Sequence, residues 1–177
     1  MTEKIDLEKR NGIKKIVAIV GGFVLGSMLL KNAGSDVIFK KRTGGSEIRL
    51  NDLSKRIASL KVYDDATAAT IGDGKLYFTI PSDLNGFNLI DADAALSTAS
   101  TSGLPTIQIA NVTDTTDMLL TKISIDANEK TSWTAVTPPV IDTTKDDVVR
   151  GDLLRVDVDV AGTGAKGLEI ILVFQQP

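Results

Sequence analysis

The sequence contains no cysteine and no histidine among its 177 residues, and aromatic residues make up only 5% of it. Without cysteine there is no disulfide framework, thiolate zinc site or cysteine nucleophile. Without histidine the most common general base is missing. One Trp and two Tyr provide little for stacking on nucleic-acid bases. These absences predict a non-enzymatic protein that uses no cofactor and binds no nucleic acid.

The charge is unevenly distributed along the chain. Residues 1–42 carry nine Lys and Arg against four Asp and Glu, which gives +5, whereas residues 43–177 carry eleven against nineteen, which gives −8. Hydrophobic residues reach 42%, enough for a packed core, and the second half is rich in Thr, Ser, Asp, Val and Ile. That composition is typical of β-strands and polar loops. We therefore expect a basic arm followed by an acidic, mainly β body.

We expect three parts: a basic-apolar arm and linker over residues 1–46, a short helical stem over 47–63, and a β domain over 64–177. In the third part apolar residues alternate with polar ones, which predicts short strands. Turn residues separate these strands, so we expect an antiparallel β-sandwich or jelly roll. The strongest strand patterns are LYFTI (76–80), NLIDADAAL (88–96), TIQIANV (106–112), LLTKISI (119–125), LLRVDVDV (153–160) and LEIILVF (168–174).

Alternation also predicts which side chains face the core. The inward residues in three of these strands are expected to be Ile90, Ala92, Ala94, Leu96, Leu154, Val156, Val158, Val160, Ile170, Leu172 and Phe174. The opposite positions hold carboxylates, and these are expected to face solvent: Asp91, Asp93, Asp157 and Asp159. The last strand differs because Ile171 and Val173 are apolar on the outer face too. A strand that is apolar on both faces is either central in its sheet or buried against another subunit. The glycine-rich stretch 161–167 is expected to be a hairpin loop.

The segment Ile16–Lys31, IVAIVGGFVLGSMLLK, holds fifteen consecutive uncharged residues. As a helix it would span roughly 22 Å at 1.5 Å per residue, short of a bilayer core. Gly22 and Gly26 would let two helices approach closely. Three interpretations stay open: an arm buried in another protein, a membrane contact, and a cleaved signal. The residues expected to anchor the chain are Ile16, Val20, Phe23, Leu25 and Leu29.

After the linker, apolar residues recur at spacings of three and four, which predicts one stripe of a short helix. They are Leu50, Leu53, Ile57 and Leu60. Two heptads are too short to form a stable coiled coil alone. The stripe therefore either packs on its own domain or forms a trimeric stem held together by the body.

Several short motifs in the sequence give only weak support for a functional site. Carboxylates in loops could ligate calcium, but the EF-hand spacing is missing; they are Asp114, Asp117, Asp146, Asp147 and Asp152. Arg150-Gly151-Asp152 matches the integrin-binding tripeptide, and Asn111-Val112-Thr113 matches a glycosylation sequon. Matches this short arise often by chance.

Four strings in the body carry a family resemblance: GGSEIRLNDLSKRIASL, GDGKLYFTIPSDLNGFNL, STASTSGLPTIQIANVTDTTDMLLTKISIDANE and VIDTTKDDV with the later GDLLRVDVDVAGTGAKGLEIILVFQ. They resemble a group of small proteins of tailed bacteriophages that are virion structural proteins. The likeness spans roughly Val37–Phe174 and leaves out the basic-apolar arm. It implies a trimeric or pseudo-symmetric, β-rich appendage of the particle: a head decoration protein, a head fibre or a fibre tip. In such an appendage we expect Ile171 and Val173 to be buried between subunits.

From this resemblance and the order of the parts, we expect a virion location and three kinds of partner. These are copies of the same chain, a capsid or connector protein bound by the arm, and a host-surface receptor. The alternative is a membrane-anchored surface binding module, with residues 16–31 in the bilayer and a glycan as its ligand. Trp133 and Tyr77 would then be the aromatic residues available for stacking on a sugar.

Overall fold

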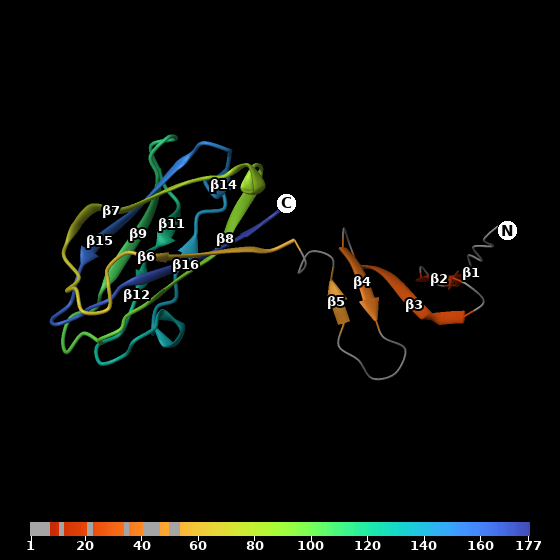
Figure 1. The fold of residues 1–177 in the computed structure, drawn as a ribbon, viewed down its shortest axis with the longest axis horizontal. Helices are drawn as coiled ribbons and strands as arrows, with labels where there is room; N and C mark the ends of the chain where they lie inside the picture. The colour runs from red at the N-terminus through yellow and green to blue at the C-terminus, as the bar shows by residue number, and fades with distance from the viewer. Residues whose placement is uncertain (1–7, 11–12, 21–22, 34–35, 41–46, 50–53) are drawn as a thin grey trace. The chain divides into compact units, whose positions relative to one another are not determined.

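The computed structural model describes residues 54–177 continuously and, before them, residues 8–10, 13–20, 23–33, 36–40 and 47–49. The chain divides into two compact units, Met1–Lys55 and Arg56–Pro177 (Figure 1). The boundary falls inside the predicted stem, because residues 47–63 contribute to both units. We call the second unit the body.

The first unit is an antiparallel sheet in which neighbours along the chain are neighbours in space. Its order is β1 (Glu8–Arg10), β2 (Ile13–Val20), β3 (Phe23–Ala33), β4 (Asp36–Lys40) and β5 (Glu47–Arg49). The short strand expected near residues 37–39 is confirmed by β4.

The apolar segment is shared between two paired strands. Val20 of β2 lies opposite Phe23 of β3, and Ile16 lies opposite Met28. The sequence between these strands is Gly-Gly, which favours a two-residue hairpin connection. The described residues of this segment are therefore extended in β2 and β3, and the length estimated above for a helix does not apply to them.

The predicted anchoring residues lie on these two strands: Ile16 and Val20 on β2, and Phe23, Leu25 and Leu29 on β3. Their role in anchoring stays a prediction. Within the described ranges, no helix combines the length and the apolar character needed to cross a bilayer.

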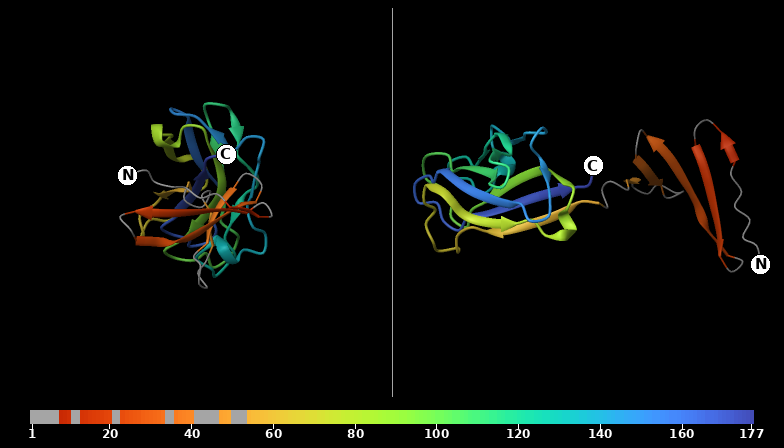
Figure 2. Two further views of the ribbon diagram at one scale, coloured as in Figure 1. Left: turned by 90° about the vertical axis from the view of Figure 1, so that its right-hand side faces the viewer. Right: turned by 90° about the horizontal axis from the view of Figure 1, so that it is seen from above.

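The body consists mainly of antiparallel sheets (Figure 2), which confirms the mainly β prediction. One sheet has the order β10 (Thr116–Asp117), β9 (Thr106–Asn111), β15 (Leu153–Val160) and β7 (Gly72–Thr79), with β12 (Ile123–Ser124) also on β9. The other has the order β14 (Asp147–Val148), β8 (Phe87–Ala95), β16 (Glu169–Gln175) and β6 (Arg56–Lys61). A further pair joins β11 (Leu119–Thr121) to β13 (Val140–Ile141), and two 3-10 turns cover Ser82–Leu84 and Ser132–Thr134.

One hydrophobic cluster receives side chains from both large sheets. Successive residues of a strand point to opposite faces, so every second residue of the central strands enters the cluster. Most predicted inward residues are indeed buried: Ala92, Ala94, Leu96, Leu154, Val156, Val158, Ile170, Leu172 and Phe174.

Two predicted core residues, Ile90 and Val160, are exposed instead, by 38% and 40%. In β8 the pairing with β16 moves from Asp91 opposite Val173 to Leu89 opposite Phe174, which leaves Ile90 as an extra residue. In β15 the register with β9 shifts in the same way between Val158 and Val160. Each β-bulge reverses the facing of the residues beyond it, and simple alternation does not anticipate it.

The predicted helical stem is wrong over Arg56–Lys61, which forms strand β6 and pairs with all of β16 from Glu169 to Phe174. Leu60 packs against the core, whereas Ile57 points outward and is 71% exposed. RIASLK fits a period of two as well as it fits a helical stripe, and pairing with a buried strand decides between them. Leu50 and Leu53 lie outside the described residues.

The predicted hairpin over residues 161–167 is also wrong, because β15 and β16 belong to different sheets. The loop crosses from one sheet to the other. Its residues bond to two other segments: Thr163 N donates to Ser102 O, and Gly167 N donates to Thr67 O.

Candidate functional site: a pocket on the outer face of the β9–β15 sheet

Four side chains form one cross-strand row on the outer face of the sheet that contains β9 and β15. Asp117 of β10 is paired with Ala110 of β9, Ala110 with Arg155 of β15, and Arg155 with Tyr77 of β7. Directly paired residues project to the same face. The row therefore places a carboxylate, a small apolar residue, a guanidinium and an aromatic ring in sequence.

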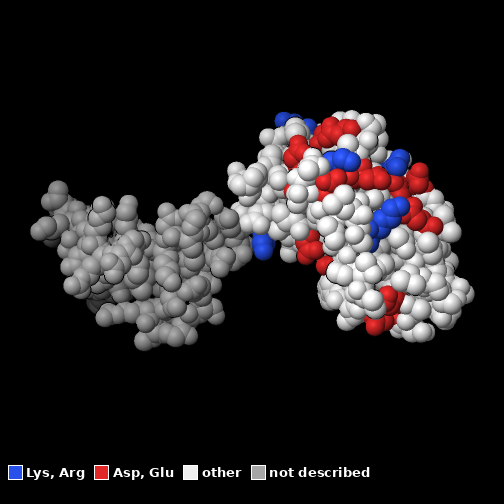
Figure 3. Space-filling model, turned by 180° about the vertical axis from the view of Figure 1, so that it is seen from behind, with Lys and Arg blue, Asp and Glu red and all other residues white. Residues whose placement is uncertain are grey.

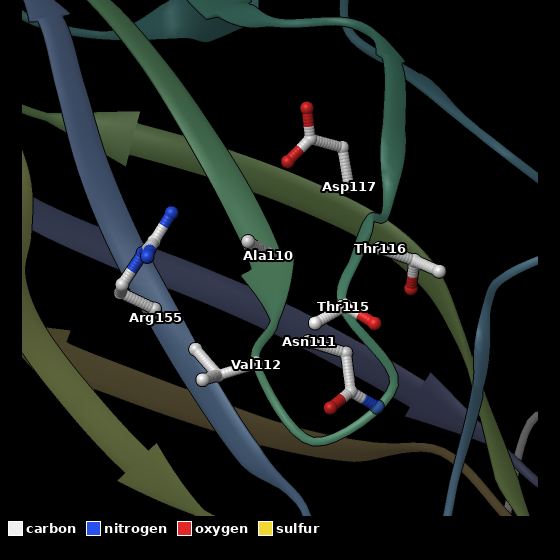
Figure 4. Close-up of a pocket in the computed structure, with 7 residues that line it drawn as sticks. All are labelled: Ala110, Asn111, Val112, Thr115, Thr116, Asp117 and Arg155. Carbon is white, nitrogen blue, oxygen red and sulfur yellow. The ribbon is translucent and has the colours of Figure 1, made fainter.

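The small size of Ala110 leaves a pocket of about 220 Å3 between its larger neighbours. Figure 4 shows Asp117 and Arg155 on either side of Ala110. The turn that follows β9 forms one end of the pocket, and there Thr115 adopts a positive φ of 55°. The complete lining is Ala110, Asn111, Val112, Thr115, Thr116, Asp117 and Arg155.

Arg155 is fixed in place by Asp157, two residues further along β15. Its Nε and Nη2 donate to Asp157 Oδ2 at 3.0 and 2.8 Å. This hydrogen-bonded carboxylate raises the pKa of Arg155. Losing rotamer freedom before a ligand arrives lowers the cost of binding, so a guanidinium held in this way is a preorganised donor.

Asp157 itself is only 4% exposed, so its predicted place on a solvent face is wrong. Its second oxygen, Oδ1, accepts a hydrogen bond of 2.7 Å from Gly74 N. Of the other three carboxylates predicted to face solvent, Asp91 is exposed, while Asp93 and Asp159 are partly buried. Asp159 forms an ion pair with Lys122, and Asp93 accepts from Ser132 Oγ at 2.8 Å.

Gly72, Asp73 and Gly74 are the first residues of strand β7, and Gly74 connects Asp157 to Tyr77. Gly74 has a φ of +66°, and a Cβ atom there would lie 3.0 Å from Tyr77 Cζ. The glycine thus permits both the positive φ and the close approach of the tyrosine ring. Tyr77 remains 54% exposed beside Arg155.

A buried hydrogen-bond network supports the turn that closes the pocket. Asn111 is 1% exposed, and its Nδ2 donates to Asp114 Oδ2 at 2.8 Å and to Asp152 Oδ2 at 3.1 Å. Asp152 is 6% exposed and also accepts from Val149 N. A glycan cannot be attached to a buried amide, and an integrin cannot reach a buried carboxylate. The sequon and the Arg-Gly-Asp motif are therefore structural elements here.

Another buried polar residue, Gln108, lies beside Asp157 and was not singled out by its pattern. Its Nε2 donates to Leu119 O at 3.1 Å, and its Oε1 accepts from Ile109 N at 2.9 Å. Leu119 is the first residue of β11, which pairs with β13, whereas the preceding strand β10 pairs with β9. The side-chain amide thus satisfies backbone groups that would otherwise lack a partner.

The loop carboxylates that could ligate calcium instead accept local hydrogen bonds or face solvent. Asp146 Oδ1 accepts from Asn88 Nδ2 at 3.1 Å, and Asp114 accepts from Asn111. Across the part of the chain that the structure describes, no three His, Cys, Asp or Glu side chains come together in an arrangement that would hold a metal ion.

The hydrogen bonds of the Asp142 carboxylate predict that the stability of the body depends on pH. Its Oδ1 accepts from Thr144 Oγ1 at 2.7 Å and from Thr144 N at 3.1 Å, and these bonds lower its pKa. A lowered folded-state pKa gives stability that is present above the unfolded value of about 3.9 and is lost as pH falls through the folded-state value. We expect Asp142→Ala to be less stable than the wild type at pH 7 and to approach it as pH falls below about 4. Urea unfolding of the variant and the wild type at pH 7 and below about pH 4 measures the difference in stability. The same difference at both pH values would contradict the prediction.

A second exposed feature is an apolar strip on the outer face of the other sheet. Val173 of β16 is paired with Ile57 of β6, and Ile171 precedes Val173 by two residues on the same face of β16. Ile171 and Val173 are partly buried, and Ile57 is 71% exposed. Asp91 and Asp93 of β8 are paired with Val173 and Ile171. The structure thus brings three predicted oligomerisation residues, Ile57, Ile171 and Val173, onto one face.

The body is acidic overall. Residues 56–177 carry nine Lys and Arg against seventeen Asp and Glu, a net charge of −8. Figure 3 shows one face on which acidic side chains dominate the charged surface. Trp133 is 69% exposed on the turn Ser132–Thr134.

Comparisons with protein-family models, with curated proteins and with solved structures found no match to this chain.

Proposed function

We propose that this chain is a non-enzymatic structural protein of a tailed-bacteriophage particle: a trimeric capsid-attached decoration or fibre protein anchored by its N-terminal unit. The observation that carries the proposal is the division into two units of opposite charge, +5 over residues 1–55 and −8 over residues 56–177. A basic unit suits contact with an acidic protein surface of the particle. The net negative charge of the body favours its solubility on the outside of the particle. The family resemblance of the body strings supports the same class.

We interpret the two large sheets as the layers of a β-sandwich, because both contribute to one hydrophobic cluster. The apolar strip Ile57, Ile171 and Val173 then lies on an outer surface, where a second copy of the chain would bury it. A single exposed apolar residue such as Ile57 is ordinary, but its position beside the half-buried Ile171 and Val173 on one sheet face favours an interface.

Labelling of purified particles tests the class. An antibody raised against the full-length protein should label the outside of the particle in negative-stain electron microscopy. A particle that lacks the gene product serves as control. Absence of label from intact and gently opened particles would contradict the proposal.

Oligomeric state tests the role of the apolar strip. We expect the full-length protein to have the mass of a trimer in light scattering, and Val173→Lys to shift it toward monomer because a charge would be buried in the interface. Thr79→Lys, an exposed position on β7, is the matched control and should remain a trimer. A monomeric wild type, or equal behaviour of the two variants, would contradict the trimer.

One observation favours the second candidate, a membrane-anchored surface binding module. Trp133 and Tyr77 are both exposed, by 69% and 54%, so both rings are available to a ligand. Fractionation separates the candidates: full-length protein that stays soluble without detergent argues against the membrane anchor.

A further inference from the structure

We propose that the pocket between Asp117 and Arg155 binds a neutral carbohydrate, with Tyr77 as the adjacent stacking surface. The proposal gives a site and a ligand class to the binding-module candidate, and it does not depend on whether the protein is part of a particle.

The free polar groups of the pocket match vicinal hydroxyls. Arg155 Nε and Nη2 are used by Asp157, which leaves Nη1 as a fixed donor without a hydrogen-bond partner among residues 54–177. The Asp117 carboxylate likewise has no hydrogen-bond or ion-pair partner within the same range. A carboxylate accepts hydrogen bonds and a guanidinium donates them. Hydroxyl groups do both, so a sugar can satisfy the two groups at once.

The apolar parts of the pocket match the C–H surface of a sugar ring. Ala110 and Val112 line it, and Ala110 leaves room for a ligand ring. Tyr77 stands next to Arg155 in the same row with more than half of its surface exposed. The Tyr77 ring lies outside the pocket lining, on the far side of Arg155, and provides a large, rigid contact area for a ligand that extends past Arg155.

The charges in and around the pocket disfavour ionic ligands. The charge of Arg155 is already offset by Asp157, and Asp73 Oδ2 lies 3.9 Å from Arg155 Nη2. Asp117 adds a further negative charge at the pocket, and the body carries −8. An anion would therefore be repelled, and a cation would leave the fixed Arg155 N–H without a hydrogen-bond acceptor. A neutral polyhydroxylated ligand avoids both costs.

An array of oligosaccharides tests the proposal with the full-length protein. The array should hold neutral hexose and N-acetylhexosamine oligosaccharides beside sialylated and sulfated ones. We expect retention on neutral members only. For the best neutral oligosaccharide, calorimetric titration should show that Asp117→Asn weakens binding at least tenfold and that Arg155→Lys, which keeps the charge but loses the planar fork, also weakens it.

Asp147→Asn is the matched control, because Asp147 is also an exposed carboxylate on a two-residue strand but belongs to the other sheet. It should bind as the wild type does. The proposal is overturned if no neutral oligosaccharide is retained, if only acidic ones are, or if Asp117→Asn and Asp147→Asn bind equally. Those results would leave the particle location, which electron microscopy tests separately, unaffected.

Discussion

Replacing Asp157 with Ala should lower the free energy of unfolding by about 2 to 4 kcal/mol, because it removes a buried acceptor and leaves three partly buried donors without it. Asp157 is 4% exposed and accepts from Gly74 N and from two nitrogens of Arg155. The variant would lose the side-chain link between strand β15 and the first residues of strand β7. Urea unfolding followed by far-UV circular dichroism measures the loss.

Asp159 provides the control on the same strand. Its ion pair with Lys122 is partly exposed, so Asp159→Ala should cost below about 1 kcal/mol. Equal losses for the two variants would mean that Asp157 does not organise this face of the sheet. The Arg155 guanidinium would then not be held in advance for a ligand.

Replacing Gly167 with Ala should cost about 2 to 5 kcal/mol, the sum of a left-handed backbone penalty and an overpacking penalty. Gly167 has a φ of +65°, and a Cβ atom there would lie 2.7 Å from Ser97 Cβ and 2.8 Å from Asp65 Cα. The latter is backbone and cannot rotate away. The crossover loop would have to move away from Asp65 and from Ser97, which lies just after β8. Urea unfolding, followed by far-UV circular dichroism, measures the loss.

Gly164 is the matched control in the same loop. Its φ is +76°, but nothing lies within 4 Å of an added Cβ atom. Gly164→Ala should therefore cost only the backbone penalty, about 1 to 2 kcal/mol. If Gly167→Ala were no worse than Gly164→Ala, the close packing of the crossover against Asp65 and Ser97 would be wrong.

Local alternation was enough to predict the strands at the centre of the body. Leu154, Val156 and Val158 of β15, and Ile170, Leu172 and Phe174 of β16, are inward as expected. These strands are long and their apolar faces are continuous, so the period of two is unambiguous. The errors at Ile90 and Val160 come from bulges, which depend on how a partner strand is paired rather than on the residue itself.

Strand β6 and the crossover loop illustrate a second limit. RIASLK is compatible with helix and strand, and pairing with β16 determines the result. The glycine-rich loop after β15 has a hairpin composition but joins two sheets. Tertiary pairing overrides local preference in both cases.

The pocket could not be predicted from the sequence, because its row combines residues 77, 110, 117 and 155 from four strands. Only the register brings them together. Asp157 was misassigned for a related reason: a carboxylate in an alternating strand usually faces solvent, and here two hydrogen-bonding groups cover it. The one available signal was the Arg-x-Asp spacing, which places opposite charges on one strand face.

Mass spectrometry of purified phage particles tests the central claim most directly. The account predicts peptides from residues 56–177 in intact particles, at a copy number that is a multiple of three per attachment site. Absence of these peptides from particles, together with recovery of the full-length protein in the host membrane fraction, would contradict the particle assignment and favour the membrane-anchored binding module.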